Sequence, residues 1–273
     1  MSTPTERYWS VTTLQKAGLG LSDAIVVSTA TKIAEASIDS RRVIDALLQD
    51  EGRDAAIDWL ERRRFQSLNA AKDRGTDIHK AAENLALGKP VTIDEKLMPW
   101  VEQYKAWLDQ YAPTFLMSEA PVYNTTWHYA GTLDGIIELD GRHLLFDIKT
   151  TEHGPDTLTR SGRPKSRPPF PEVALQLVAY ARAERVGLVS DRREAGGRRY
   201  YVYDSTASYE PMPKVDGALC VVISPFDCFA VPVPCASTNP ISSGAMPASL
   251  HASSIRRVCA SGLGREMPLV CPS

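Results

Sequence analysis

The sequence predicts an α/β fold, in which a mixed β-sheet flanked by helices follows an N-terminal helical region. Apolar positions in residues 1–70 recur at helical spacing, without an obvious strand. From residue 118 the pattern changes to the alternation typical of strands, and a helical pattern returns over residues 172–186. A content of 43% apolar and 23% charged residues in 273 is ordinary for a globular protein. We therefore expect one domain of moderate size, with or without appendages.

Charge and hydropathy bear on location and partners. No apolar run approaches the roughly 20 residues that a membrane span needs. The first ten residues lack the basic and then apolar order of a signal peptide, so we expect a cytoplasmic protein without a membrane partner. The net charge of −2 neither indicates nor excludes a nucleic-acid binder. Such domains usually carry a basic excess, but an acidic site can hide part of a local basic surface.

The cysteines do not follow a metal-binding spacing. All five lie in the last quarter of the chain, and no two form a CxxC pair: Cys220, Cys228, Cys235, Cys259 and Cys271. We therefore expect neither a structural zinc nor an iron–sulfur cluster.

The first half of the chain reads as a series of helices. A pattern over residues 39–65 is divided by Gly52 and closes at the arginine triplet 62–64, which suits a solvated helix end better than a phosphate contact. The next helix is expected over residues 69–87, ended by a glycine and a proline. His79 lies beside the apolar stripe of that helix, where a histidine is more often structural than a ligand. A further helix is expected over residues 94–111.

Strands follow from residue 118. The first is expected over residues 118–123, and the next two flank Asp140-Gly141, a pair typical of a type I′ hairpin turn. With a two-residue loop, Leu139 faces Arg142, and counting back places Asp134 directly opposite Asp147. Because side chains alternate along a strand, Asp147 and Lys149 project from one face.

The two aspartates are the first candidate functional residues. Opposite residues have Cβ atoms about 4.5–5.5 Å apart, and like charges there are destabilising. A divalent cation between the carboxylates of Asp134 and Asp147 would turn the repulsion into coordination, with the backbone carbonyl of Ile148 as a further oxygen ligand. Together with Lys149, such a site suits phosphodiester hydrolysis. The alternative is an edge hairpin whose charges face water.

A polar connection of about twenty residues follows the hairpin. It carries four basic residues, which are either solvated or hold a phosphate backbone: Arg160, Arg163, Lys165 and Arg167. In the helix over residues 172–186, Gln176 and Tyr180 lie four apart and therefore on one side.

The last predicted strands cover residues 199–203, 219–223 and 228–233. Beyond Pro234 the periodicity ends, and serine, proline, alanine and glycine dominate. We read three regions: an N-terminal helical region over residues 1–68, a core over residues 69–234, and a disordered or aberrant tail over residues 235–273.

Four short motifs, in order, resemble those of the PD-(D/E)XK nuclease superfamily. They lie between residues 70 and 185: Gly75-Thr76-Asp77-Ile78-His79, Gly131-Thr132-Leu133-Asp134, Asp147-Ile148-Lys149 and Gln176-Leu177-Val178-Ala179-Tyr180. Within the superfamily the sequence is most similar to RecB-like and Cas4-like exonucleases, including those of phages. The chain lacks the N-terminal cysteine that the iron–sulfur cluster of many Cas4 and AddB relatives needs.

The resemblance implies a fold, a metal and site residues. It implies a restriction-endonuclease-like core that binds Mg²⁺ or Mn²⁺ through His79, Asp134 and Asp147. Lys149 becomes the motif lysine, and Gln176 and Tyr180 line the catalytic site.

The function implied is metal-dependent DNA cleavage, most often exonucleolytic, in recombination, repair or phage DNA processing. Linear DNA or single-stranded ends are the expected partners, and a helicase or recombinase would be a separate protein. The alternatives are a structure- or sequence-specific endonuclease of the same superfamily, and a DNA-binding or assembly protein with an idle nuclease site.

Overall fold

A mixed β-sheet forms the centre of the protein, as the sequence predicts. The computed structural model describes residues 5–19, 23–159, 161–187, 192–195 and 198–233. In this part of the chain the strands are β1 (Thr5–Ser10), β2 (Thr114–Asn124), β3 (Tyr129–Leu139), β4 (Arg142–Thr150), β5 (Arg185–Val186), β6 (Arg192–Ala195), β7 (Arg198–Asp204), β8 (Glu210–Pro211), β9 (Gly217–Ile223) and β10 (Cys228–Val233).

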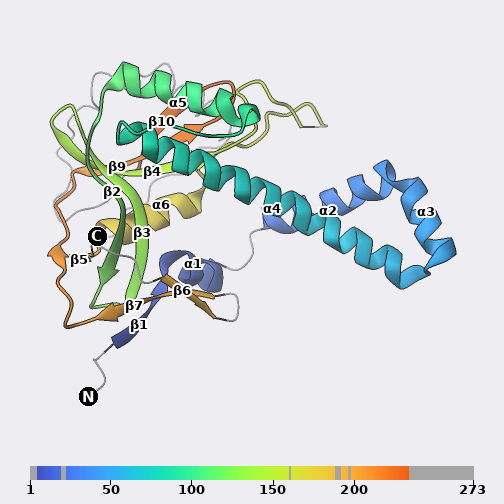
Figure 1. The fold of residues 1–273 in the computed structure, drawn as a ribbon, viewed down its shortest axis with the longest axis horizontal. Coiled ribbons are helices and arrows are strands. Elements are labelled where there is room, and N and C mark those ends of the chain that lie inside the picture. The colour runs from blue at the N-terminus through green and yellow to red at the C-terminus, as the bar shows by residue number, and fades with distance from the viewer. Residues whose placement is uncertain (1–4, 20–22, 160, 188–191, 196–197, 234–273) are drawn as a thin grey trace, which may run out of the picture.

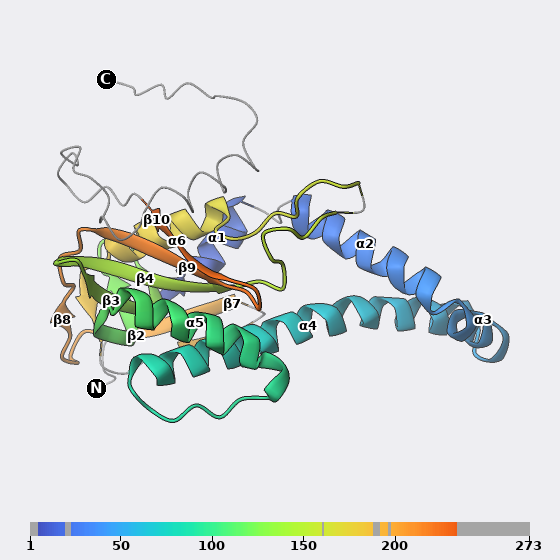
Figure 2. The ribbon, with the colours of Figure 1, turned by 90° about the horizontal axis from the view of Figure 1, so that it is seen from above.

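Helices cover both faces of this sheet (Figures 1 and 2). The described helices are α1 (Val11–Leu19), α2 (Asp23–Asp39), α3 (Arg41–Asp50), α4 (Arg53–Ala86), the 3₁₀ helix η1 (Glu95–Leu97), α5 (Met98–Tyr111) and α6 (Pro171–Ala181). Figure 2 shows α4 and α5 on one face, and α1 and α6 on the other. No described helix is both long and apolar enough to cross a membrane.

The main path of the sheet runs β10-β9-β4-β3-β1-β7-β6. The pairs β4–β9 and β1–β3 are parallel, and the other pairs are antiparallel. Strand β2 pairs with one edge of β3, and β1 and β4 pair with the other. Strands β5 and β8 extend the sheet beyond β2. Both faces of β9 are buried, which explains why its sequence is continuously apolar and does not alternate.

Two strands share one edge of β3. Strand β1 pairs with the first two residues of β3, Tyr129 and Ala130. Strand β4 pairs with Gly135–Leu139. Because β2 occupies the other edge, no described strand pairs with residues 131–134 on the shared edge. The sheet therefore opens between β1 and β4, at the residues that lead to Asp134.

The β3–β4 hairpin has the predicted turn and register. Asp140 and Gly141 both have positive φ, 51° and 70°. Leu139 lies opposite Arg142, and the described ladder ends at the pair Gly135–Phe146. The next pair in this register would be Asp134 and Asp147, so the strands separate where the candidate site begins.

The core has one apolar cluster on each face of the sheet. On the α6 face, Val173, Leu177 and Tyr180 pack with strand residues that include Leu145 and Val222. On the α4–α5 face the cluster contains Ile78, Ala82, Tyr104, Trp107, Phe146, Ile148 and Val221. Ile78 is therefore the residue that fixes the position of its neighbour His79.

The helical region differs from the prediction. The break at Gly52 is confirmed, but the expected helix end at residues 62–64 is wrong, because α4 continues from Arg53 to Ala86. Residues 53–74 contain neither glycine nor proline, so nothing in the backbone interrupts the helix. The expected boundary between residues 68 and 69 falls inside this helix.

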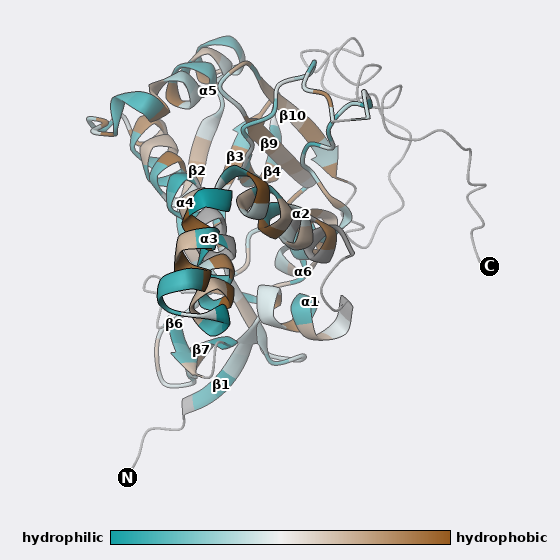
Figure 3. Cartoon of the chain, turned by 90° about the vertical axis from the view of Figure 1, so that its right-hand side faces the viewer, coloured by the Kyte–Doolittle hydropathy of each residue, from teal (hydrophilic) through white to brown (hydrophobic). Residues whose placement is uncertain are grey.

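Helix α4 belongs to an arm that projects from the sheet. In Figures 1 and 2 the first half of α4 runs beside α2, and α3 joins them at the far end. Helix α3 contains no buried residue. In Figure 3 much of α3 is teal, whereas β9 and β10 are largely brown. The C-terminal half of α4 lies on the sheet and ends as predicted, before Gly88 with its φ of 64°.

Two further elements differ from the prediction. Strand β1 was not expected, because the alternation in Thr5–Ser10 is short and its two partners lie more than 100 residues away. Helix α6 ends at Ala181, before residue 186, and Arg185–Val186 pair with β2 as β5. The tail over residues 235–273 lies outside the described residues.

Candidate active site

Asp147 and Lys149 project from one face of β4, as the alternation predicts. The Lys149 ammonium contacts both carboxylate oxygens of Asp147, with Nζ 2.7 Å from Oδ1 and 2.6 Å from Oδ2. It also lies 3.3 Å from the carbonyl oxygen of Ile148. Asp147 is only 2% exposed, and its Oδ2 lies 3.8 Å from Sγ of Cys220 on the parallel strand β9.

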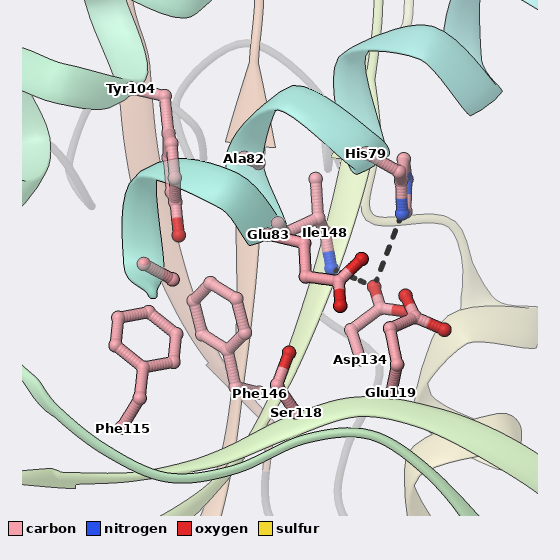
Figure 4. A pocket seen from close by; sticks show the side chains of 11 residues that line it. His79, Ala82, Glu83, Tyr104, Phe115, Ser118, Glu119, Asp134, Phe146 and Ile148 are labelled. Atoms are coloured by element: carbon pink, nitrogen blue, oxygen red, sulfur yellow. Dashed lines mark hydrogen bonds and ion pairs between the residues drawn. The ribbon is translucent and has the colours of Figure 1, made fainter. Parts of the chain in front are cut away.

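Asp134 bridges the two strands at the point where their ladder ends. Its Oδ2 accepts a hydrogen bond of 2.7 Å from the backbone N–H of Ile148. A side chain thus takes the place of the next backbone acceptor. Nδ1 of His79 lies 3.6 Å from the same oxygen, so α4 brings the histidine to the opening of the sheet (Figure 4).

Burial dominates the electrostatics of this group. It raises the pKa of Asp147 to about 6; Lys149 opposes the rise, and Asp134 adds to it. Burial also raises the pKa of Asp134, against the opposing effects of Lys149 and the Ile148 N–H. The pKa of Lys149 would fall on burial, but Asp147 and Asp134 outweigh that effect and raise it. One ammonium therefore compensates two carboxylates incompletely.

His79 is neutral at physiological pH. Burial, followed by the charge of Lys149, lowers its pKa to about 4. A neutral imidazole has a free lone pair, which is the form that binds a metal ion.

The donor atoms fit a hard divalent cation. Carboxylate and carbonyl oxygens with an imidazole suit Mg²⁺ or Mn²⁺. The Lys149 ammonium touches the Asp147 carboxylate and the Ile148 carbonyl, the oxygens expected to face a cation. The two carboxylates carry more negative charge than the Lys149 ammonium neutralises, so a second positive charge would be stabilised here. In this conformation the described residues include no ready-made group of three metal-ligating side chains.

Helix α6 places the glutamine and tyrosine of the fourth motif over β3. Nε2 of Gln176 donates to Oη of Tyr180 at 3.1 Å, so the two share one side as predicted. The ring of Tyr180 lies so close to Gly131 that a Cβ there would be 2.3 Å from Cε1. The glycine of the second motif is therefore needed for the tyrosine of the fourth to pack.

The basic residues in the connection between β4 and α6 differ in their exposure and in their contacts. Arg160 lies outside the described residues, and Arg163 and Lys165 are exposed. Arg167 forms an ion pair with Asp227 in the β9–β10 turn, stacks 4.7 Å from the ring of Phe229, and has a side chain only 13% exposed. Its guanidinium attaches the connection to the sheet. DNA contacts by these residues stay a prediction.

The sequence reasoning missed two carboxylates that line the same pocket as His79 and Asp134, those of Glu83 and Glu119 (Figure 4). Glu83 is one helical turn after His79, which is a signal that the sequence does contain. Glu119 has a positive φ of 47°, unusual for a residue with a long side chain.

Glu119 lies opposite Asp134, because the flanking pairs of β2 and β3 are Ser118–Gly135 and Ala120–Leu133. Desolvation, followed by the charges of Asp134 and Glu83, raises its pKa to about 7. The pocket thus contains two carboxylates in addition to that of Asp134.

No family model matches the sequence, and no curated protein matches it either.

Proposed function

We propose that this protein is a metal-dependent deoxyribonuclease that hydrolyses phosphodiester bonds, acting most readily as an exonuclease. The observation that carries the proposal is the placement of Asp134, Asp147 and Lys149 where β3 and β4 separate. The two carboxylates supply negative charge that can hold a metal ion, and the lysine supplies a cation that can stabilise charge on a phosphate.

The role of the metal follows from the donor set. Asp134, Asp147, the Ile148 carbonyl and the neutral His79 would hold Mg²⁺ or Mn²⁺. The bound ion would neutralise phosphate charge and lower the pKa of a water molecule.

Lys149 supplies positive charge in this proposal. Its raised pKa keeps the ammonium protonated at neutral pH, so it suits stabilisation of charge on the phosphate oxygens better than removal of a proton from water. Gln176 and Tyr180 would position the lysine and the substrate from α6. The exposed Arg163 and Lys165 would contact the phosphate backbone.

The test is cleavage of end-labelled linear DNA and closed circular DNA by the purified protein in Mg²⁺, Mn²⁺ or EDTA. We expect degradation of linear DNA only with a divalent metal. Cleavage of the closed circle at a similar rate would indicate an endonuclease. DNA binding without any cleavage would indicate a binding protein with an idle site.

Asp147→Asn and Lys149→Gln should each lower the cleavage rate at least about 100-fold, because each removes a charge that acts on the transition state. Circular dichroism would show that both variants are folded. The control is Asp109→Asn on the exposed side of α5, which should cleave normally. Full activity in either site variant would contradict the mechanism.

A further inference from the structure

Strands β1, β7 and β6 form an antiparallel ribbon at one end of the main sheet path. Opposite residues in its registers are Arg7 with Val202, Trp9 with Tyr200, and Arg193 with Tyr200. Side chains alternate along each strand, so these residues share one face with Arg198. We call it the ribbon face: Arg7, Trp9, Arg193, Arg198, Tyr200 and Val202.

The ribbon face carries arginines, whereas the glutamates of the same strands lie on the other face. Glu6 and Glu194 lie on the opposite face, where Glu194 is 3.9 Å from Arg199. The acidic residue whose register places it on the ribbon face is Asp204, at the far end, and its carboxylate accepts a hydrogen bond from Thr206. Arg7, Arg193 and Arg198 are exposed. This local excess of positive charge contrasts with the net charge of −2 for the whole chain.

Two aromatic rings lie between these arginines. The rings of Trp9 and Tyr200 have centroids 6.2 Å apart and meet edge to face. The guanidinium of Arg7 lies 4.4 Å from the Tyr200 centroid and 5.8 Å from that of Trp9. Both rings are only partly buried, whereas Tyr8 and Tyr201 of the opposite face are buried. The ribbon face thus presents flat apolar surfaces beside cations.

We propose that the ribbon face binds single-stranded nucleic acid, which on the function proposed above is the single-stranded end of a DNA substrate. Aromatic rings stack on unpaired bases whatever their sequence, while neighbouring arginines neutralise phosphates. A duplex offers its phosphates but keeps its bases stacked inside, so it would use only the charge. An acidic protein segment would likewise leave the rings unused.

The ribbon is joined to the candidate active site through β3. Trp9 pairs with Tyr129, five residues before Asp134 on the same strand. At about 3.3 Å per residue this separation is roughly 16 Å along the strand. Tyr129 and Leu145 both pack in the α6-face cluster, so alternation places Trp9 on the same face of the sheet as Asp147 and Lys149. One oligonucleotide of the length that single-strand binding folds hold, roughly 4–16 nucleotides, is long enough to reach from the ribbon to these two residues.

The experiment measures binding without cleavage. Fluorescence anisotropy of a labelled oligothymidylate and of a duplex of equal length would be recorded in EDTA, over a range of salt concentrations. The variants are Tyr200→Leu, which keeps an apolar side chain suited to a strand, and the double change Arg7→Ala with Arg198→Ala. Arg42→Ala, on the exposed side of α3, removes a charge elsewhere and is the matched control.

We expect the wild-type protein to bind the single strand more tightly than the duplex. Tyr200→Leu should weaken single-strand binding roughly 5- to 100-fold, with little effect on the duplex. The double arginine variant should weaken binding and make the slope of log K against log salt less negative by about 0.7 for each phosphate that the protein no longer neutralises. Arg42→Ala should bind like the wild type.

Unchanged single-strand affinity and salt slope in the folded arginine variant would overturn the proposal. Equal losses for duplex and single strand in Tyr200→Leu would overturn it too, as would full competition by polyglutamate. These outcomes are independent of nuclease activity. If the wild type binds as expected but never cleaves, the proposed function fails and the ribbon face stands. If it cleaves while the ribbon variants bind normally, only the ribbon face fails.

Discussion

At the scale of single residues, Asp134 combines a structural and a chemical role. Its carboxylate accepts the Ile148 N–H where the ladder between β3 and β4 stops, yet it lies beside the buried Asp147. Burial disfavours its charge and raises its pKa, against the opposing effects of Lys149 and the Ile148 N–H. On the proposed function, such a residue destabilises the metal-free protein and becomes a ligand when a cation binds.

Asp134→Asn should therefore raise the melting temperature of the metal-free protein by a few degrees. The amide oxygen keeps the hydrogen bond from Ile148, while the buried charge is removed. The same change should reduce the further rise that Mn²⁺ produces, because a ligand stabilises only the state that binds it. Thermal unfolding with and without Mn²⁺ measures both effects.

Two controls separate charge from hydrogen bonding. Asp134→Ala loses the acceptor for Ile148 and should be less stable than Asp134→Asn. Asp109→Asn, on the exposed side of α5, should change neither melting temperature nor Mn²⁺ response. If Asp134→Asn lowered the melting temperature and left the Mn²⁺ shift intact, Asp134 would be a purely structural residue.

Glu119 predicts a dependence of stability on pH. Its pKa of about 7 lies above the value near 4.5 in the unfolded chain. The folded state thus favours the protonated form, and its stabilisation is present below about pH 4.5 and lost as pH rises through 7. Glu119→Gln should melt at a higher temperature than the wild type at pH 8, and the difference should vanish near pH 4.5.

The measurement is a pair of melting curves at each pH, because the difference between the two proteins cancels the titration of other groups. His79 titrates in the same range with the opposite sign, since its lowered pKa makes acid destabilising. A constant difference from pH 4.5 to pH 8 would mean that Glu119 does not titrate in this way.

At the scale of elements, the contact between β3 and α6 depends on the absence of a side chain at Gly131. A methyl group there would overlap the buried ring of Tyr180, which Gln176 also holds by a hydrogen bond. This contact joins two of the motifs noted in the sequence, although they are about 45 residues apart. Helix α6 is therefore positioned by the strand that carries Asp134.

Gly131→Ala should destabilise the protein by about 1–3 kcal/mol through overpacking. It should also lower DNA cleavage, because relief of the overlap moves Tyr180 away from the carboxylates. Denaturant unfolding and the cleavage assay measure the two effects. The matched control is Gly75→Ala in α4, whose added Cβ would meet only Thr150 Oγ1 at 3.5 Å, and which should be neutral or stabilising. Equal stability of the two variants would show that the Tyr180 ring can move aside at little cost in free energy.

At the scale of the whole molecule, β10 is the strand at one edge of the described sheet. Strand β10 pairs with β9 along its full length, and Val233 at its end is buried in the α6-face cluster. All the strands of the described sheet thus lie between residues 5 and 233.

A stop codon in place of Cys235 should therefore leave melting temperature and cleavage unchanged. A stop codon in place of Cys228 removes β10, exposes the edge of β9, and should abolish folding. Soluble yield, circular dichroism and cleavage compare the two truncations. Loss of soluble protein on truncation at Cys235 would show that residues 235–273 contribute to the fold.

The local part of the structure followed from the sequence. Asp140-Gly141 predicted the turn, and the turn set the register of the pairs from Leu139–Arg142 to Gly135–Phe146, which end next to Asp134 and Asp147. Gly52 and Gly88 predicted helix ends. The expected break near residue 64 failed because no residue there interrupts a helix, and β1 was missed because its alternation is too short to stand out.

By itself, the sequence determined the β3–β4 hairpin and, through alternation, the shared face of Asp147 and Lys149, because turn type and side-chain direction are properties of neighbouring residues. Only the tertiary structure decided that β1 and β4 share one edge of β3 and leave a gap beside Asp134. It also decided the positive φ of Glu119, the use of Arg167 in an ion pair with Asp227, and the ribbon face. Each of these depends on contacts between segments far apart in the chain. A pattern of neighbouring residues predicts neither the geometry of such contacts nor the entropy lost in forming them.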